Sequence, residues 1–251
     1  MSLFRNIVFT AVIAGLLSGL LLTIMQSLST VPLILQAEVF ENAGGGAGHS
    51  HDVPAAGAAS PADHHHDEAA WAPADGLERF IYTAAANALS AIGFGLVLVA
   101  ASEALGGFRG WRGGLMFGIA GFLAVSLAPG LGLPPELPGM PAAELGPRQI
   151  WWISTAVCTA AALGLLAYTR SAIFAALAIG LLIAPHLIGA PLPPSHETVV
   201  PVELHARFVN AVYATNLVFW ALLGAACGML RERFHAGEEA SAASAAKLAS
   251  R

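Results

Sequence analysis

The sequence predicts an all-α, polytopic integral membrane protein with six membrane-spanning helices, or five by the main alternative count. Of its 251 residues 56% are hydrophobic and only 11% are charged, whereas about 25% of the residues in a soluble domain are charged. Several uncharged runs approach the roughly 20 residues that a helix needs to cross a bilayer. The basic residues are also distributed unevenly among the connections between these runs, as they are in membrane proteins.

The first apolar run covers residues 7–28 and follows Arg5, as the apolar part of a signal peptide would. It is long, however, and has no small-residue A-x-A cleavage pattern. We therefore expect residues 1–38 to hold an N-terminal tail and a retained first helix, with cleavage as the less favoured alternative.

Residues 39–79 are rich in Gly, Ala, Pro, His and Asp. This composition has too little periodic hydrophobicity to form a core, and it predicts a flexible, histidine-rich loop. Apolar runs resume in a helical region, 80–230, where we expect five further spans: 80–102, 113–128, 150–168, 171–188 and 208–230. Residues 231–251 are small and polar, and we expect a disordered tail there.

Two of these spans leave the count open. The third is short and runs into the breaker-rich string APGLGLPPELPGMP, so we expect it to tilt, stop early or re-enter the membrane. The fourth and fifth are separated only by Thr169 and Arg170, which fits either two helices in a tight hairpin or one long broken segment.

The basic residues give an independent indication of orientation, because cytoplasmic loops are enriched in Lys and Arg. Six spans with a cytoplasmic N-terminus put eight basic residues inside and three outside. The eight are Arg5, Arg109, Arg112, Arg170, Arg231, Arg233, Lys247 and Arg251, and the three are Arg79, Arg148 and Arg207. Both termini are then cytoplasmic, and the histidine-rich loop, the Pro-rich loop and residues 191–207 share the outer face.

Several classes of function are excluded or disfavoured. A net charge of −5 gives no basic footprint for nucleic acid. Cys158 and Cys227 both lie inside apolar runs, so neither a disulfide framework nor zinc-finger spacing is present. The sequence has no phosphate-binding G-x-x-x-x-G-K-[ST] loop and no H-E-x-x-H helix. We therefore expect neither an enzyme nor an ATP-driven pump acting alone.

The histidine-rich loop carries the strongest chemical signal. It contains H-S-H-D followed by D-H-H-H-D-E, and we predict that these side chains bind metal: His49, His51, Asp52, Asp63, His64, His65, His66, Asp67 and Glu68. Imidazole suits late first-row divalent ions, and the carboxylates add oxygen ligands and attract cations. A flexible loop gathers ligands at an entropic cost, which favours capture and release over tight storage. A merely hydrophilic loop is the alternative.

A second predicted group of metal ligands follows the fifth span and consists of His186, His196, Glu197 and His205. An ionisable residue near membrane depth is costly and usually faces a pathway or a partner, which singles out His186; a histidine bonded to a loop carbonyl is the alternative. Glu203 would chelate together with His205 only in an extended segment, because a helix separates residues two apart.

Three acidic residues flank the spans. Glu38 and Glu41 lie three apart just past the first span and form a plausible cation vestibule if the helix continues that far. Glu103 lies at the cytoplasmic end of the second span, where we expect it to pair with Arg109 or Arg112; a metal ligand at the exit is the alternative. Small residues in the first two spans also predict close helix packing: Ala14, Gly15, Ser18, Gly19, Gly93 and Gly95.

Several segments, taken in order, resemble the CbtA family, a family of proposed cobalt transporter subunits in bacteria. They are FRNIVFTAVIAGLLSGLLLTIMQ, VPLILQAEVFE, LPPELPGMPAAEL, RQIWW, PHLIGAP and FWALLG, and they run through nearly the whole chain. The histidine-rich insertion after the first span adds to the resemblance. The family is usually described with five predicted spans, whereas the charge distribution here favours six.

The resemblance implies cobalt uptake linked to cobalamin supply, in the inner membrane of a bacterium, with a small single-span partner, CbtB, that carries its own histidine motif. It brings no established transport residues with it. The residues themselves leave nickel or zinc open as the metal. They also leave open a non-transporting metal-binding or regulatory subunit, as well as the oligomeric state.

Overall fold

The computed structural model describes residues 2–45, 73–74, 76–108, 110–195 and 197–249. Within these ranges the regular structure is entirely helical, which confirms the prediction of an all-α polytopic membrane protein. Five helical units are long and apolar enough to cross a membrane. They are α1 (Ser2–Leu28), α3 (Leu77–Ala104), the continuous unit Gly110–Gly132, α6 (Leu145–Tyr168) and α8 (Val202–Ala249).

Helix α1 is followed almost directly by a further helix, α2 (Thr30–Gly45), with a break at Ser29. Pro32 causes the break, because proline has no N–H for the carbonyl of Leu28 and its ring collides with that carbonyl. The hydroxyl of Ser29 donates instead to the Met25 carbonyl at 2.6 Å. Helix α2 extends into residues 39–45, which the composition had assigned to the loop. The run A-E-V-F-E continues the helix there.

The expectation that the third apolar run is short and stops early is wrong, because the run forms a helical unit of 23 residues. It forms α4 (Gly110–Gly121), a π-helical segment η2 (Phe122–Leu127) and α5 (Ala128–Gly132) without interruption. Pro129 stands directly after the π-helical segment, at the start of α5. The wider π-helical turn before it gives the proline ring room, so the breaker string ends the helix only after Gly132.

The short apolar helix is instead α7 (Ala172–Ile188), which has 17 residues and is not among the five membrane-length units. A helix of that length covers about 26 Å, slightly less than a hydrocarbon core of about 30 Å. It packs against α6 as a tight hairpin, one of the two predicted alternatives. Helix α8 continues through Ala249, where the composition predicts disorder. That segment is rich in alanine, which has the highest helix propensity.

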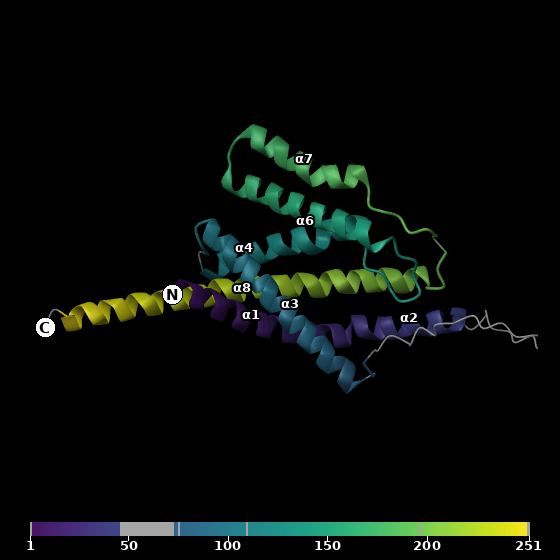
Figure 1. The fold of residues 1–251 in the computed structure, drawn as a ribbon, viewed down its shortest axis with the longest axis horizontal. Helices are drawn as coiled ribbons and strands as arrows, with labels where there is room; N and C mark the ends of the chain where they lie inside the picture. Colours follow the sequence, from purple (N-terminus) through teal and green to yellow (C-terminus); the bar gives the residue numbers. More distant parts are fainter. Residues whose placement is uncertain (1, 46–72, 75, 109, 196, 250–251) are drawn as a thin grey trace, which may run out of the picture.

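The helices lie roughly side by side and define two ends of the molecule (Figure 1). One end carries α2, the connection 133–144 and the connection 189–201; we call it the loop end. The other carries the N-terminus, the connections 105–109 and 169–171 and the last part of α8; we call it the terminus end. The described parts of the segments that the charge distribution assigned to one face thus lie at the same end of the bundle: the end of α2, the Pro-rich connection 133–144, and residues 191–195 and 197–201.

Glycines bring α1 and α3 into close contact. A Cβ at Gly15 would lie 2.6 Å from the Ile92 nitrogen, and one at Gly19 would lie 2.8 Å from the Cα of Ala88. Such distances leave no room for a side chain, as in small-xxx-small packing. The predicted close approach is confirmed at Gly15, Gly19 and Gly95, whereas Gly93 has nothing within 4 Å.

A second pair, α4 and α8, packs through glycines on both helices. A Cβ at Gly114 would lie 2.8 Å from the Cα of Gly228, and one at Gly228 would lie 2.5 Å from the Gly110 carbonyl oxygen. Gly118 and Gly224 interlock in the same way one turn further along. The spacing G-x-x-x-G-x-x-x-G over 110–118 and G-x-x-x-G over 224–228 is visible in the sequence and is typical of such contacts.

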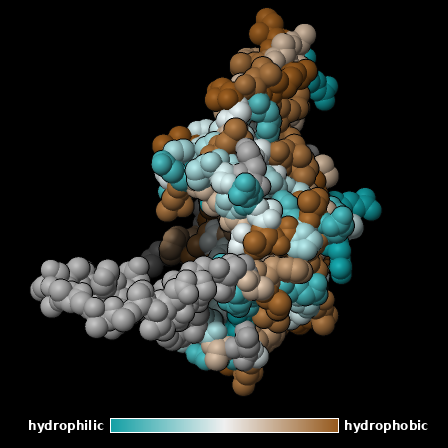
Figure 2. Space-filling model, turned by 90° about the vertical axis from the view of Figure 1, so that its right-hand side faces the viewer, coloured by the Kyte–Doolittle hydropathy of each residue, from teal (hydrophilic) through white to brown (hydrophobic). Residues whose placement is uncertain are grey.

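The outer surface of the bundle is largely apolar. Figure 2 looks onto the loop end and shows hydrophilic residues gathered across the middle, with hydrophobic ones dominating toward the top, where α7 lies. On α7, Ile173, Leu187 and Ile188 are each more than three-quarters exposed. In lipid this exposure is favourable, so the surface fits a protein that is solvated by a bilayer.

Candidate metal pathway

The predicted capture residues of the histidine-rich loop lie outside the described part of the chain, as does His196. Their role as metal ligands stays a prediction. The described residues that flank this segment are the end of α2 and the start of α3, and both lie toward the loop end (Figure 1).

His186 lies at the loop end of α7 and is half-buried. Its ring packs edge-on against Trp151 of α6, with ring centroids 5.8 Å apart. The indole N–H of Trp151 donates to the carbonyl of Pro185 at 3.2 Å, which fixes the two helices to each other here. His186 is therefore held in place by an aromatic contact, and none of the described residues forms a hydrogen bond with its ring nitrogens.

His205 is engaged by a loop carbonyl. Its Nε2 lies 3.0 Å from the carbonyl oxygen of Pro135, so the ring N–H donates there and Nδ1 carries the lone pair. Glu203 precedes it in the first turn of α8, is exposed, and lies on a different face because the segment is helical. Glu197 is also exposed. The structure thus does not bring Glu203 and His205 together as a chelating pair.

Among the described residues, no group of three or more His, Cys, Asp or Glu side chains is close enough to hold a metal ion. Any tight site of that kind would involve residues outside the described ranges. Within those ranges the polar features of the bundle are hydroxyl and amide groups and several ion pairs.

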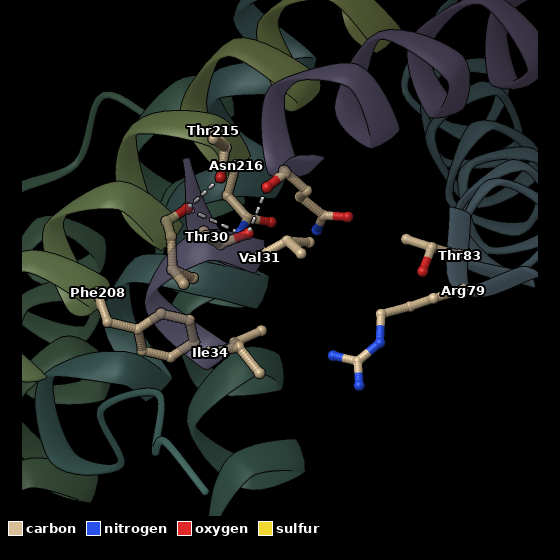
Figure 3. A pocket seen from close by; sticks show the side chains of 10 residues that line it. Thr30, Val31, Ile34, Arg79, Thr83, Phe208, Thr215 and Asn216 are labelled. Carbon is tan, nitrogen blue, oxygen red and sulfur yellow. Dashed lines mark hydrogen bonds between the residues drawn. The ribbon is translucent and has the colours of Figure 1, made fainter. Parts of the chain in front are cut away.

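The most notable of these features is a cavity of about 340 Å³ toward the loop end, which we call the chamber. Its polar lining comes from Gln26, Thr30, Arg79, Thr83, Thr215 and Asn216, and its apolar lining from Val31, Ile34, Phe208 and Val212. Arg79 and Thr83 of α3 face Thr30, Thr215 and Asn216 across it (Figure 3). Hydroxyl and amide groups inside an apolar bundle are costly and mark pathways or partners.

Helical periodicity explains why these residues converge. Thr30, Ile34 and Glu38 are spaced four apart and share one face of α2. Arg79, Thr83 and Asn87 have the same spacing on α3, and residues 208, 212, 215 and 216 form a third stripe on α8. The sequence reasoning missed these stripes; the four-residue spacing of polar groups inside the spans was the signal.

Hydrogen bonds and one ion pair connect α3 to α1 and α2 along the chamber. The amide nitrogen of Asn87 donates to Gln26 Oε1 at 2.7 Å and to Thr23 Oγ1 at 3.0 Å. Nearer the loop end, Arg79 Nη1 lies 3.1 Å from Glu38 Oε1. Glu38, expected to be part of a cation vestibule, therefore lies at the rim of the chamber in an ion pair.

A second cavity, of about 670 Å³, lies on the other side of α8. Its lining includes Ser126 of the π-helical segment, Tyr213, and the ion pair of Glu136 with Arg148, whose N and O atoms are 3.2 Å apart. Val212 and Asn216 line both cavities. This part of α8 is therefore the wall between them.

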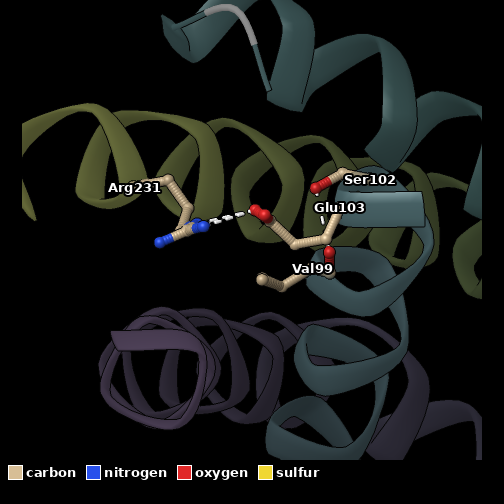
Figure 4. Close-up of polar contacts among 4 residues, drawn as sticks. All are labelled: Val99, Ser102, Glu103 and Arg231. Atoms are coloured by element: carbon tan, nitrogen blue, oxygen red, sulfur yellow. Dashed lines mark hydrogen bonds and ion pairs between the residues drawn. The ribbon is translucent and has the colours of Figure 1, made fainter. Parts of the chain in front are cut away.

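A buried ion pair lies near the terminus end. Nε of Arg231 donates to Glu103 Oε1 at 2.9 Å, and Nη2 donates to the same oxygen (Figure 4). Arg231 is 2% exposed, and its third nitrogen, Nη1, is buried without a hydrogen-bond partner among the described residues. Glu103 thus forms an ion pair, as expected, but its partner is Arg231 of α8; Arg112 is exposed, and Arg109 lies outside the described residues.

Comparison with known proteins identifies the family. A family model described as "Probable cobalt transporter subunit (CbtA)" matches residues 4–232, from the first turns of α1 to the buried arginine of α8. No curated protein and no solved structure matches the chain. Because the match includes every membrane-length helix and both residues of the buried ion pair, the chain belongs to the CbtA family of probable cobalt transporter subunits.

Proposed function

We propose that the chain is the membrane-embedded subunit of an uptake transporter for a divalent metal, and that cobalt is the ion it carries. The family assignment supports a cobalt transporter subunit. The single observation that carries the proposal is the chamber, because it places oxygen-bearing side chains inside an otherwise apolar helical bundle. Nickel and zinc are the alternative substrates, since imidazole ligands bind all three ions.

The loop end faces the outside of a bacterial cytoplasmic membrane in this proposal, and both termini are cytoplasmic. The excess of basic residues in the opposite connections supports this orientation. The membrane potential then favours inward movement of the ion. One charge crossing 100 mV is worth about 2.3 kcal/mol, so a divalent ion gains about twice that amount.

The histidine-rich loop acts as the capture site. Its imidazole and carboxylate groups bind the ion and raise its concentration at the loop end, where α3 begins close to Arg79 of the chamber. His186, His196, Glu197 and His205 lie on the same side of the membrane in this orientation and provide further ligands during transfer. A small single-span subunit of the CbtB type is the expected partner, and the bilayer solvates the exposed apolar surface.

Reconstitution tests the proposal. The purified full-length chain is placed in liposomes with an inside-negative potential, alone and together with the CbtB-type subunit, and entry of radioactive cobalt is followed. Entry that depends on the chain is the expected result. If the chain only binds cobalt and no entry occurs in either preparation, its role is metal binding or regulation, and the proposal is wrong. Competition by nickel and zinc in the same assay determines the preferred ion.

A further inference from the structure

We propose that the chamber is a transit site for a divalent cation that keeps most of its water shell, and that the guanidinium of Arg79 takes the place of the cation when the chamber holds no ion. This inference rests on the proposed function and specifies how the ion passes the outer half of the bundle. Its basis is the combination of acceptor groups, neutral lining and a tethered positive charge.

Part of the lining presents hydrogen-bond acceptors to the chamber. The hydroxyl of Thr30 donates to the Gln26 carbonyl at 3.3 Å, and that of Thr215 donates to the Ala211 carbonyl at 2.9 Å. The amide nitrogen of Asn216 donates to the Val212 carbonyl at 2.9 Å. These protons are taken up by backbone carbonyls, in the same helix for Thr215 and Asn216 and in α1 for Thr30, so the oxygen lone pairs are left for a partner that brings protons or positive charge. Water molecules bound to a cation supply both.

The oxygen groups of the lining are uncharged, and this determines what kind of ion they hold. None of the described residues that line the chamber is a carboxylate, an imidazole or a thiol. Neutral oxygens do not compensate for removing the water shell of a small divalent ion, which dehydrates reluctantly. Six waters take up roughly 180 Å³ at about 30 Å³ each, so a cavity of about 340 Å³ accommodates the hydrated ion.

Arg79 is the positive charge already present. Its side chain extends from α3 into the chamber (Figure 3) and pairs with the carboxylate of Glu38 at the rim. Two positive charges in one cavity repel each other. An entering divalent ion must therefore displace the guanidinium, and Glu38 exchanges Arg79 for the ion as it passes.

A hydrated ion is recognised here by charge and size, because its waters separate the metal from the protein. Cobalt, nickel and zinc have the same charge and similar hydrated sizes, so the chamber does not distinguish among them. The choice of metal falls to the imidazole ligands outside the chamber, where direct coordination is available.

Initial rates of cobalt entry at limiting concentration, measured in cells that express the full-length chain, test this site. Arg79→Gln removes the competing charge and is expected to raise the rate on the order of tenfold. Glu38→Gln removes the carboxylate that exchanges Arg79 for the ion and is expected to lower the rate by a similar factor. Because misfolded protein cannot produce a higher rate, the first variant is informative even if it lowers the yield.

Thr215→Val and Thr155→Val form a matched pair. Both hydroxyls donate to a carbonyl of their own helix, but only Thr215 lines the chamber. We expect Thr215→Val to slow entry of cobalt, nickel and zinc by the same factor and Thr155→Val to leave it unchanged.

An unchanged or lower rate for Arg79→Gln would overturn the role of the guanidinium. Equal behaviour of the two valine variants, or a change in the ratio among the three metals, would overturn the hydrated transit site. Lack of cobalt entry with the unmodified chain is a different result, because it removes the proposed function and this site together.

Discussion

Glu103 and Arg231, 128 positions apart in the sequence, join α3 to α8 through two hydrogen bonds to one carboxylate oxygen. The two partners differ in exposure. The side chain of Glu103 is 28% exposed, whereas that of Arg231 is 2% exposed. Loss of the carboxylate would leave a guanidinium in an apolar interior, while loss of the guanidinium would leave a carboxylate that water can still reach.

This asymmetry predicts unequal effects of the two single substitutions. Glu103→Ala is expected to destabilise the protein by about 3–5 kcal/mol, as for a buried ion pair that loses one partner. Arg231→Met is expected to cost less, because its linear apolar side chain fills part of the space and Glu103 is solvated. The difference is measured as the midpoint of thermal unfolding in detergent, with size-exclusion chromatography used to monitor unfolding.

The double variant Glu103→Leu with Arg231→Met is the control. Replacing both charges by apolar groups of similar volume is often neutral, so it is expected to be more stable than Glu103→Ala alone. A double variant no more stable than that single variant would mean that the ion pair itself is required.

The glycine contact between α4 and α8 predicts that Gly114→Ala destabilises the bundle. The added Cβ would collide with the backbone of Gly224 and Gly228, and such overpacking costs about 1–3 kcal/mol. Gly164→Ala on α6 is the matched control, because nothing lies within 4 Å of its Cβ position. There the exchange is expected to stabilise the helix by up to about 1 kcal/mol. Thermal unfolding of both variants in detergent should show shifts of opposite sign.

Substitution of the five loop histidines by alanine tests the capture site. We expect His49, His51, His64, His65 and His66, replaced together, to raise the cobalt concentration at half-maximal uptake and to leave the maximal rate intact. Complete loss of uptake at every concentration would instead assign these residues to the pathway itself.

The loop carboxylates provide a separate control for that experiment. Changing Asp52, Asp63, Asp67 and Glu68 to their amides removes charge and keeps every imidazole. The effect of this change on cobalt uptake is expected to disappear at high ionic strength, where attraction between exposed charges is screened. The effect of the histidine substitutions is expected to persist, because coordination bonds are short-ranged.

His186→Phe separates metal binding by His186 from its packing role. Phenylalanine retains an edge-on contact with Trp151 but has no nitrogen ligand. If His186 is a ligand in the pathway, uptake at limiting cobalt falls while the thermal stability stays close to that of the unmodified chain. If this variant takes up cobalt at the same rate as the unmodified chain, His186 has only a packing role.

Much of the fold could be predicted from the sequence, because lipid requires long apolar helices and these are visible as uncharged runs. The exceptions are local. The breaker string after the third run suggested an early stop, but a π-helical segment accommodates Pro129 and extends the helix to Gly132. Pro32 explains the break between α1 and α2 at Ser29. The apolar pattern alone did not predict α2 as a separate helix, because it placed the loop directly after the first helical region.

The chamber was less predictable. Thr, Asn and Gln are common in membrane helices and carry little signal one at a time, so Thr83 and Asn216 did not stand out. Their significance comes from three helices placing similar stripes around one cavity, and helix order cannot be deduced from periodicity. The expected partner of Glu103 was wrong for the same reason. Arg109 and Arg112 are close to Glu103 in the sequence, whereas Arg231 is distant and only the packing of α8 against α3 brings it near.

Two pairs of helices pack through glycines, α1 with α3 and α4 with α8, and one hydrophobic core joins α1, α3 and α8. Toward the terminus end, the pair of Glu103 with Arg231 links α3 to α8 by charge. Toward the loop end, the chamber lies between the same two helices. Helices α3 and α8 are thus tied together at one end and separated by a polar cavity at the other.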